Sequence, residues 1–124
     1  MDWKLELITI PVSDVDRAKA FYVDQVGFNP DHDQKVNEGL RFVQLTPPGS
    51  ACSIAIGTGL TTAQPGSVQG LQVVVPDAEA ARRQLVDRGV DASEVQDYPW
   101  GRFVFFSDPD GNGWAVQQIV RLQA

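Results

Sequence analysis

The second half of this chain repeats the pattern of its first half at an offset of 61–63 residues. A strand is predicted over Leu5–Val12, ending at Pro11-Val12-Ser13-Asp14, and another over Leu71–Val75, ending at Pro76-Asp77. A repeat of this kind indicates two similar modules, neither of which buries a core alone. The repeat therefore constrains the fold more than any single motif does.

Each predicted strand leads into an amphipathic helix. Ser13 is the expected N-cap of the first helix, with Asp16 as a weak capping-box partner, and Asp77 is the expected cap of the second. Gly27 and Gly89, 62 residues apart, are expected to end the helices. Apolar stripes recur at helical spacing, at Val15, Ala18, Tyr22 and Val26 and again at Ala78, Ala81 and Leu85.

Paired strands follow each helix. The segments 41–46 and 102–107 both read Arg-Phe-Val and run into turn residues, and β-branched segments at 52–56 and 114–120 follow those turns. A further short strand is expected near Lys35–Val36 and near Ala92–Val95, and residues 58–69 form the linker. Two copies of strand, helix and three strands predict an α+β fold with one helix behind each sheet.

Composition limits the function classes. The 124 residues fit one domain, 1–124, and contain neither a signal peptide nor the ~20-residue apolar run of a membrane span, so we expect a cytoplasmic location and no membrane partner. The net charge of −6 and the scattered basic residues argue against nucleic acid. The same acidity attracts cationic small molecules, although solubility alone also explains it.

The joint pattern resembles a known family. The Val-Ser-Asp helix start leading to Ala20-Phe21-Tyr22, and the late turn Asp108-Pro109-Asp110-Gly111-Asn112, stand inside the repeat as in the vicinal oxygen chelate superfamily of glyoxalases, bleomycin resistance proteins and dioxygenases. The resemblance implies two tandem βαβββ modules, about 1–57 and 70–124, whose cup-shaped sheets face one another around a cavity. It also implies a homodimer, in some relatives with a groove built from both chains.

Relatives commonly hold a divalent metal with His, Glu or Gln at fixed strand positions. Those positions fall on Leu7, Ser53, Gly70 and Ala115, and a register slip of two residues moves them to Thr9, Ala55, Gln72 and Gln117. Neither set contains a carboxylate or an imidazole, so we predict a metal-free pocket with no cofactor. His32, between Asp31 and Asp33, is expected in a surface loop outside the predicted strands.

The candidate pocket is apolar and aromatic. Strand alternation places Val104 and Phe106 on the helix side of the sheet, and Phe103 and Phe105 on the cavity side. Tyr98 and Trp100 lie in the preceding loop, where they either form a lid over the ligand or cover the edge of the domain. Cys52 is read as a small apolar residue whose facing depends on the strand register. The predicted ligand-binding residues are Leu7, Thr9, Gln44, Cys52, Gln72, Tyr98, Trp100, Phe103, Phe105 and Gln117.

Three functions remain open at this stage. The first is a binder of planar or cationic small molecules, like the drug-sequestering members of the family. The second is a metal-independent isomerase or lyase acting on a small carbonyl compound, in which an amide or Tyr98 polarises an oxygen. The third is a metal-dependent glyoxalase or dioxygenase. No catalytic residue is assigned.

Overall fold

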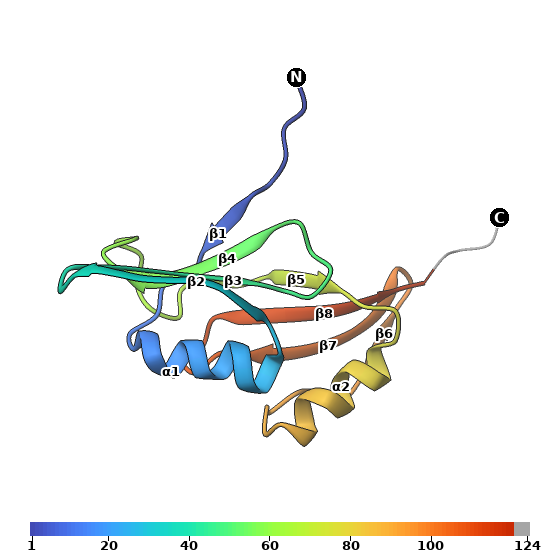
Figure 1. The fold of residues 1–124 in the computed structure, drawn as a ribbon. Coiled ribbons are helices and arrows are strands. Elements are labelled where there is room, and N and C mark those ends of the chain that lie inside the picture. The colour runs from blue at the N-terminus through green and yellow to red at the C-terminus, as the bar shows by residue number, and fades with distance from the viewer. Residues whose placement is uncertain (121–124) are drawn as a thin grey trace.

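The computed structural model describes residues 1–120, which form two four-stranded sheets, each with its own helix (Figure 1). The first module contains β1 (Leu7–Thr9), α1 (Val15–Ala20), η1 (Phe21–Val26), β2 (Asn29–Asn37), β3 (Leu40–Thr46) and β4 (Ser53–Thr58). The second contains β5 (Leu71–Val74), α2 (Ala78–Asp87), β6 (Gln96–Tyr98), β7 (Gly101–Ser107) and β8 (Gly113–Ile119).

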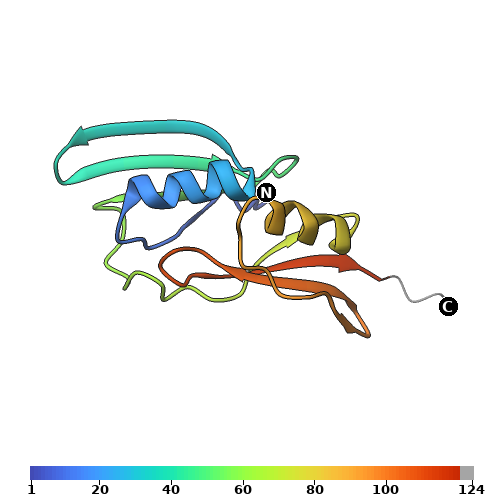
Figure 2. The same cartoon turned by 90° about the horizontal axis from the view of Figure 1, so that it is seen from below.

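The two sheets have the same topology. The strand orders are β1-β4-β3-β2 and β5-β8-β7-β6, and in each sheet the first strand pairs in parallel while the other pairs are antiparallel. This confirms the predicted α+β class and the tandem βαβββ modules. In Figure 2 both helices lie between the two sheets, which face one another across them.

The helix starts differ in one respect from the prediction. Asp77 caps α2 as expected, since its carboxylate accepts the Ala80 backbone N–H at 3.1 Å. In α1, however, the cap is Asp14 and not Ser13, because Asp14 accepts the Arg17 N–H at 3.0 Å. The Ser13 hydroxyl donates instead to the Asp110 carboxylate of the second module, at 2.5 Å.

Both helix ends lie at the predicted glycines. After α1 the chain continues through one stretch of π-helix, η1, and Gly27 then adopts a left-handed conformation with φ of 95°. Gly89 follows α2 with φ of 84°. Only glycine takes this conformation without steric cost, which explains why the two residues stand at matching places in the repeat.

Three strand predictions need correction. β1 is shorter than Leu5–Val12, and the expected strand at Ala92–Val95 lies instead at Gln96–Tyr98, so Tyr98 belongs to a strand. The predicted short strand near Lys35–Val36 is a nine-residue strand, β2, whose residues are all exposed and which includes His32. Because neither face of β2 is buried, its sequence lacks the apolar alternation that marks most strands.

The core fills the space between each sheet and the helices. Val43 and Leu45 of β3 and Val104 and Phe106 of β7 face the helices, and they belong to one apolar cluster that spans both modules. The aromatic rings of Tyr22, Phe28, Phe106 and Trp114 meet at its centre. Each sheet therefore presents its other face away from the core.

A buried polar network joins the modules inside this core. The Tyr22 hydroxyl of η1 donates to the Asp108 carboxylate at 2.7 Å and accepts the indole N–H of Trp114 at 3.0 Å. The fully buried Asn112 donates to Asp108 and to the carbonyl of Pro11, both at 2.8 Å. Burial and the Asp108 charge raise the pKa of Tyr22, so its phenol stays neutral.

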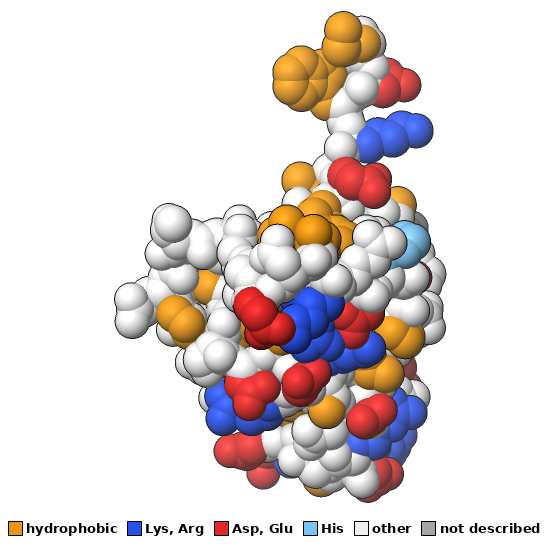
Figure 3. Space-filling view, turned by 60° about the vertical axis from the view of Figure 1, so that its left-hand side comes forward, with side chains coloured by type: hydrophobic (Ala, Val, Ile, Leu, Met, Phe, Trp, Pro, Cys, Tyr) orange, Lys and Arg blue, Asp and Glu red, His pale blue; other side chains and the backbone are white. Residues whose placement is uncertain are grey.

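The first residues of the chain form an arm that extends from the body (Figures 1 and 3). Its apolar side chains are exposed, with relative exposures of 106% for Met1, 89% for Trp3 and 68% for Leu5. Within residues 1–120, no helix is both long and apolar enough to cross a membrane.

Candidate functional site

The outer face of the second sheet carries most of the predicted ligand-binding residues. Strand register places Gln72 of β5 beside Ala115 of β8, and Ala115 beside Phe105 of β7. In the next row Gln117 lies beside Phe103. Val104 and Phe106 point into the core, and strand alternation turns Phe103 and Phe105 to the opposite, outer face; the opposite facing of the two pairs was predicted.

Four aromatic rings form a continuous run on this face. Phe105 and Phe103 are stacked with centroids 5.9 Å apart, Tyr98 meets Phe103 edge-on at 5.5 Å, and Trp100 stacks on Tyr98 at 5.5 Å. Phe103 is buried, but Trp100 is 61% exposed and Tyr98 and Phe105 about 40%. The run therefore offers open ring faces and edges to an incoming planar molecule.

Polar groups border the aromatic run. The side-chain amides of Gln72 and Gln117 hydrogen-bond to each other, and Gln117 also donates to the carbonyl of Trp100 at 3.3 Å. A hollow of about 660 Å³ adjoins Phe105 and Ala115 and also contains Asp91 and Ser93. This volume is within the range of small-molecule sites, roughly 300–1,000 Å³.

The outer face of the first sheet is more polar. Leu7 lies beside Ser53, and Thr9 beside Ala55, which pairs with Gln44. The buried Ser53 hydroxyl accepts the Gln44 amide at 3.2 Å and lies 2.6 Å from the Thr46 hydroxyl, which in turn contacts the Asp31 carboxylate. Cys52 precedes β4 as a half-exposed free thiol and not as a buried apolar residue.

The strand positions that hold a metal in relatives lack suitable ligands here. Leu7 and Ser53 are neighbours in the first sheet, and Ala115 lies beside Gln72 in the second. A hydroxyl and an amide are poor ligands for a catalytic divalent cation when no carboxylate or imidazole accompanies them. Residues 1–120 also contain no group of three His, Cys, Asp or Glu side chains suited to metal binding.

The cluster around His32 is an ion-pair network. Asp33 accepts both Nε and Nη2 of Arg41, at 3.0 and 2.8 Å, and pairs with Lys19 at 2.9 Å. Hydrogen bonds from Arg41, and then from Lys19, hold the pKa of Asp33 well below its usual range. With Asp33 occupied in this way, the Asp-His-Asp sequence does not make a metal site.

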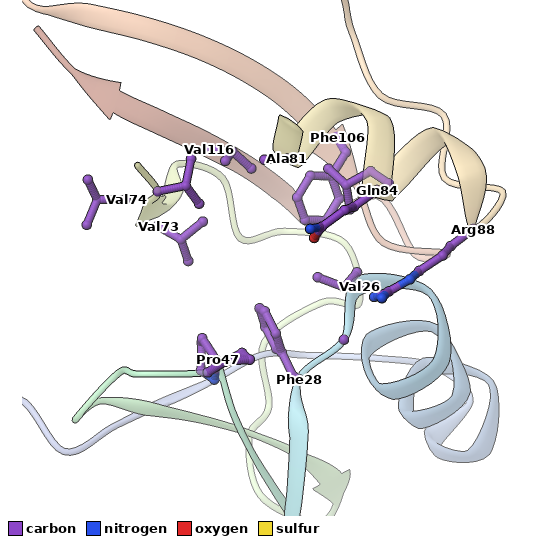
Figure 4. Close-up of a pocket in the computed structure, with 14 residues that line it drawn as sticks. Val26, Phe28, Pro47, Val73, Val74, Ala81, Gln84, Arg88, Phe106 and Val116 are labelled. Atoms are coloured by element: carbon purple, nitrogen blue, oxygen red, sulfur yellow. The ribbon is translucent and has the colours of Figure 1, made fainter. Parts of the chain in front are cut away.

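A cleft between the modules was not predicted from the sequence. Its volume is about 330 Å³, and it lies on the helix side of the sheets, away from the ten predicted residues. Figure 4 shows Phe28 and Pro47 of the first module opposite Val73 and Val116 of the second, with Gln84 of α2 and Arg88, the C-cap of this helix, at one side. Residues so far apart in sequence meet only through the packing of the modules, so no local motif marks them.

Comparison with known proteins gives a consistent result. The model of the Glyoxalase/Bleomycin resistance protein/Dioxygenase superfamily matches residues 4–116. The crystal structure of TnmS3, an antibiotic binding protein from Streptomyces sp. CB03234, is 37% identical in sequence, with a TM-score of 0.87 over 96% of this chain and 98% of that one.

Two further crystal structures are similar over nearly their whole length. A glyoxalase/bleomycin resistance protein from Streptomyces sp. CB03234 is 39% identical, with a TM-score of 0.82 over 93% of this chain and 100% of that one. A superfamily member from Sphaerobacter thermophilus DSM 20745 is 32% identical, with a TM-score of 0.82 over 94% and 98% of the two chains.

Proposed function

Because this chain belongs to the Glyoxalase/Bleomycin resistance protein/Dioxygenase superfamily, we propose that it is a small-molecule binding protein whose ligand stacks on the aromatic outer face of the second sheet without a metal ion. The observation that carries this proposal is the run of four touching rings, from Trp100 through Tyr98 and Phe103 to Phe105. A neighbouring amide pair supplies the few directional polar groups that such pockets use.

The ligand class follows from shape and charge. Flat, partly exposed rings favour a planar molecule, and TnmS3, which is 37% identical, is by its name an antibiotic binding protein. Asp91 is one of the residues that line the hollow beside Phe105, and the chain carries a net charge of −6. Both features favour a planar cation over a planar anion.

We further propose that the binding groove is completed in a homodimer. The outer faces of the two sheets point away from the helices that lie between the sheets, so one chain does not bring Thr9 or Gln44 over the aromatic run (Figure 2). A second copy could place its first sheet there. Trp3 and Leu5 are exposed, and in an extended strand their side chains would lie on the same face as that of Leu7. This pattern supports an arm that extends β1 along a partner chain.

The binding proposal is tested with two planar probes of similar size, the cation proflavine and the neutral ketone acridone. Thermal-shift and fluorescence titrations should give a saturable response to proflavine, and a probe at about 100 times its Kd adds about 2.7 kcal/mol of stability. Trp100→Ala should weaken binding about tenfold, the equivalent of 1.4 kcal/mol. Val86→Ala, an exposed apolar truncation on α2, is the matched control.

Equal loss in both variants, or no saturable response to either probe, contradicts the proposal. If incubation of acridone with the protein alone gave a new product, resolved by chromatography, and Gln72→Leu and Gln117→Leu abolished its formation, a metal-independent enzyme would be the better description. Light scattering on the wild type and on Leu5→Ser tests the dimer separately, with dissociation expected for the variant.

A further inference from the structure

The cleft between the modules has the features of a second ligand site, separate from the aromatic face. Its volume of about 330 Å³ lies at the lower end of the range of small-molecule sites. Both modules contribute apolar walls, Phe28 and Pro47 on one side and Val73 and Val116 on the other (Figure 4). These walls would exclude water from an aliphatic or small aromatic group.

One side of the cleft is cationic. Gln84 lies on α2, and Arg88 is the C-cap residue directly after this helix, four residues further on; both side chains reach the cleft (Figure 4). Among residues 1–120, no carboxylate lies within ion-pair distance of Arg88, whereas Arg41 and Arg102 both have acidic partners. The guanidinium at this edge is thus not neutralised by another described side chain.

The position of Arg88 is set by contacts with the first module. The Gln25 amide donates to the Arg88 backbone carbonyl at 3.1 Å. The guanidinium lies over Gly27, where an added Cβ would be only 2.7 Å from Nη1.

We infer that this cleft binds a small monocarboxylate with an apolar chain. The chain would lie between Phe28 and Val73, and the carboxylate would accept two parallel hydrogen bonds from the Arg88 guanidinium and a third from the Gln84 amide. This inference does not depend on the aromatic site. The cleft and the hollow beside Phe105 have only the buried Phe106 in common among their lining residues, and the two surfaces favour ligands of opposite charge.

The test is a calorimetric titration of the full chain with octanoate and with octanol, which has the same chain length but no charge. Octanoate should bind saturably and at least tenfold more tightly than octanol. Arg88→Met should remove this preference. Arg83→Met, which deletes the same charge from the exposed surface of the same helix, should change octanoate affinity less than twofold.

A second variant tests the location. Ala81 lines the cleft, so Ala81→Leu should lower octanoate affinity by occupying its volume, with folding checked by circular dichroism. Amide shifts in an NMR titration should centre on Gln84, Arg88 and Gly27 and not on Phe105 or Gln117. Absence of octanoate binding to folded wild type, equal effects of the two arginine variants, or shifts confined to the aromatic face would each overturn the inference.

Discussion

The hydroxyl of Tyr22 should contribute several kcal/mol to the stability of the fold. It is the only link within the described residues that joins the indole of Trp114 to the carboxylate of Asp108, and both partners are buried. Tyr22→Phe keeps the ring and its stacking on Phe28 but removes this oxygen. The perturbation is therefore confined to hydrogen bonding.

The magnitude follows from the groups left behind. The Trp114 N–H loses its acceptor, which costs about 1–3 kcal/mol for a buried donor. Asp108 loses one of four hydrogen bonds but keeps those from Asn112 and from the backbone of Asp110. We expect a net loss of about 2–4 kcal/mol, or a fall in Tm of about 10 °C for a chain of this size.

The assay is urea unfolding of wild type and variant, with Tyr98→Phe as the matched control. The Tyr98 hydroxyl donates at the surface, to Gln96 at 3.1 Å, so its removal should cost less than about 0.5 kcal/mol. The reasoning is refuted if Tyr22→Phe is no more destabilising than Tyr98→Phe.

The same pair gives a prediction for alkaline pH. Because burial and Asp108 raise the pKa of Tyr22, the native state keeps this proton above pH ~10, where the unfolded state releases it. The contribution of the Tyr22 hydroxyl to the free energy of unfolding is therefore fully present below pH ~10. Above that pH it falls by up to about 1.4 kcal/mol per pH unit. The stability gap between wild type and Tyr22→Phe should therefore narrow as pH rises beyond 10.

Three further predictions concern local structure, each measured by chemical denaturation. The pKa of Asp33 is lowered in the native state, so its pairing with Arg41 stabilises the fold above pH ~4 and is lost in more acidic solution. Asp33→Asn should therefore be less stable than wild type by about 1 kcal/mol at neutral pH, because the network is partly exposed. This difference in stability should shrink below pH 4. Gly89→Ala should cost about 1–2 kcal/mol because φ is 84°, whereas Gly39→Ala, at ordinary φ, should cost less. Asp14→Ala should cost about 1 kcal/mol through the lost cap, and an effect no larger than that of an ordinary surface substitution would mean that the cap is unimportant.

The repeat made the fold largely predictable. Periods of 3.6 and 2 residues identify the helices and the buried strands, and the glycines at 27 and 89 mark both helix ends because their conformation excludes other residues. β2 was underestimated for a physical reason, since an exposed strand needs no apolar alternation. The α1 cap was misassigned by one residue because Ser13 and Asp14 are both good caps, and a tertiary contact with Asp110 engages the serine.

The candidate sites were predictable to different degrees. The opposite facing of Phe103 and Val104 follows from strand alternation, so the aromatic face could be proposed from sequence. The environment of Tyr22 could not, because its partners Asp108 and Trp114 are 86 and 92 residues away. The cleft at Arg88 was hidden for the same reason, since it exists only where α2 packs near the end of η1.

The way the modules pack also determines which faces stay open. The contacts between modules use the helix sides, where the Tyr22 network and the shared core lie, so the outer sheet faces are not buried within one chain. Trp100, Tyr98 and Phe105 are then left partly exposed together, on a chain whose arm also exposes Trp3 and Leu5. Large exposed apolar patches are rare on monomers and often belong to interaction sites, which supports the proposed ligand face. A ligand together with a second chain would cover both the aromatic rings and the arm. We therefore expect ligand affinity and dimer affinity to change together in the Trp100→Ala and Leu5→Ser variants.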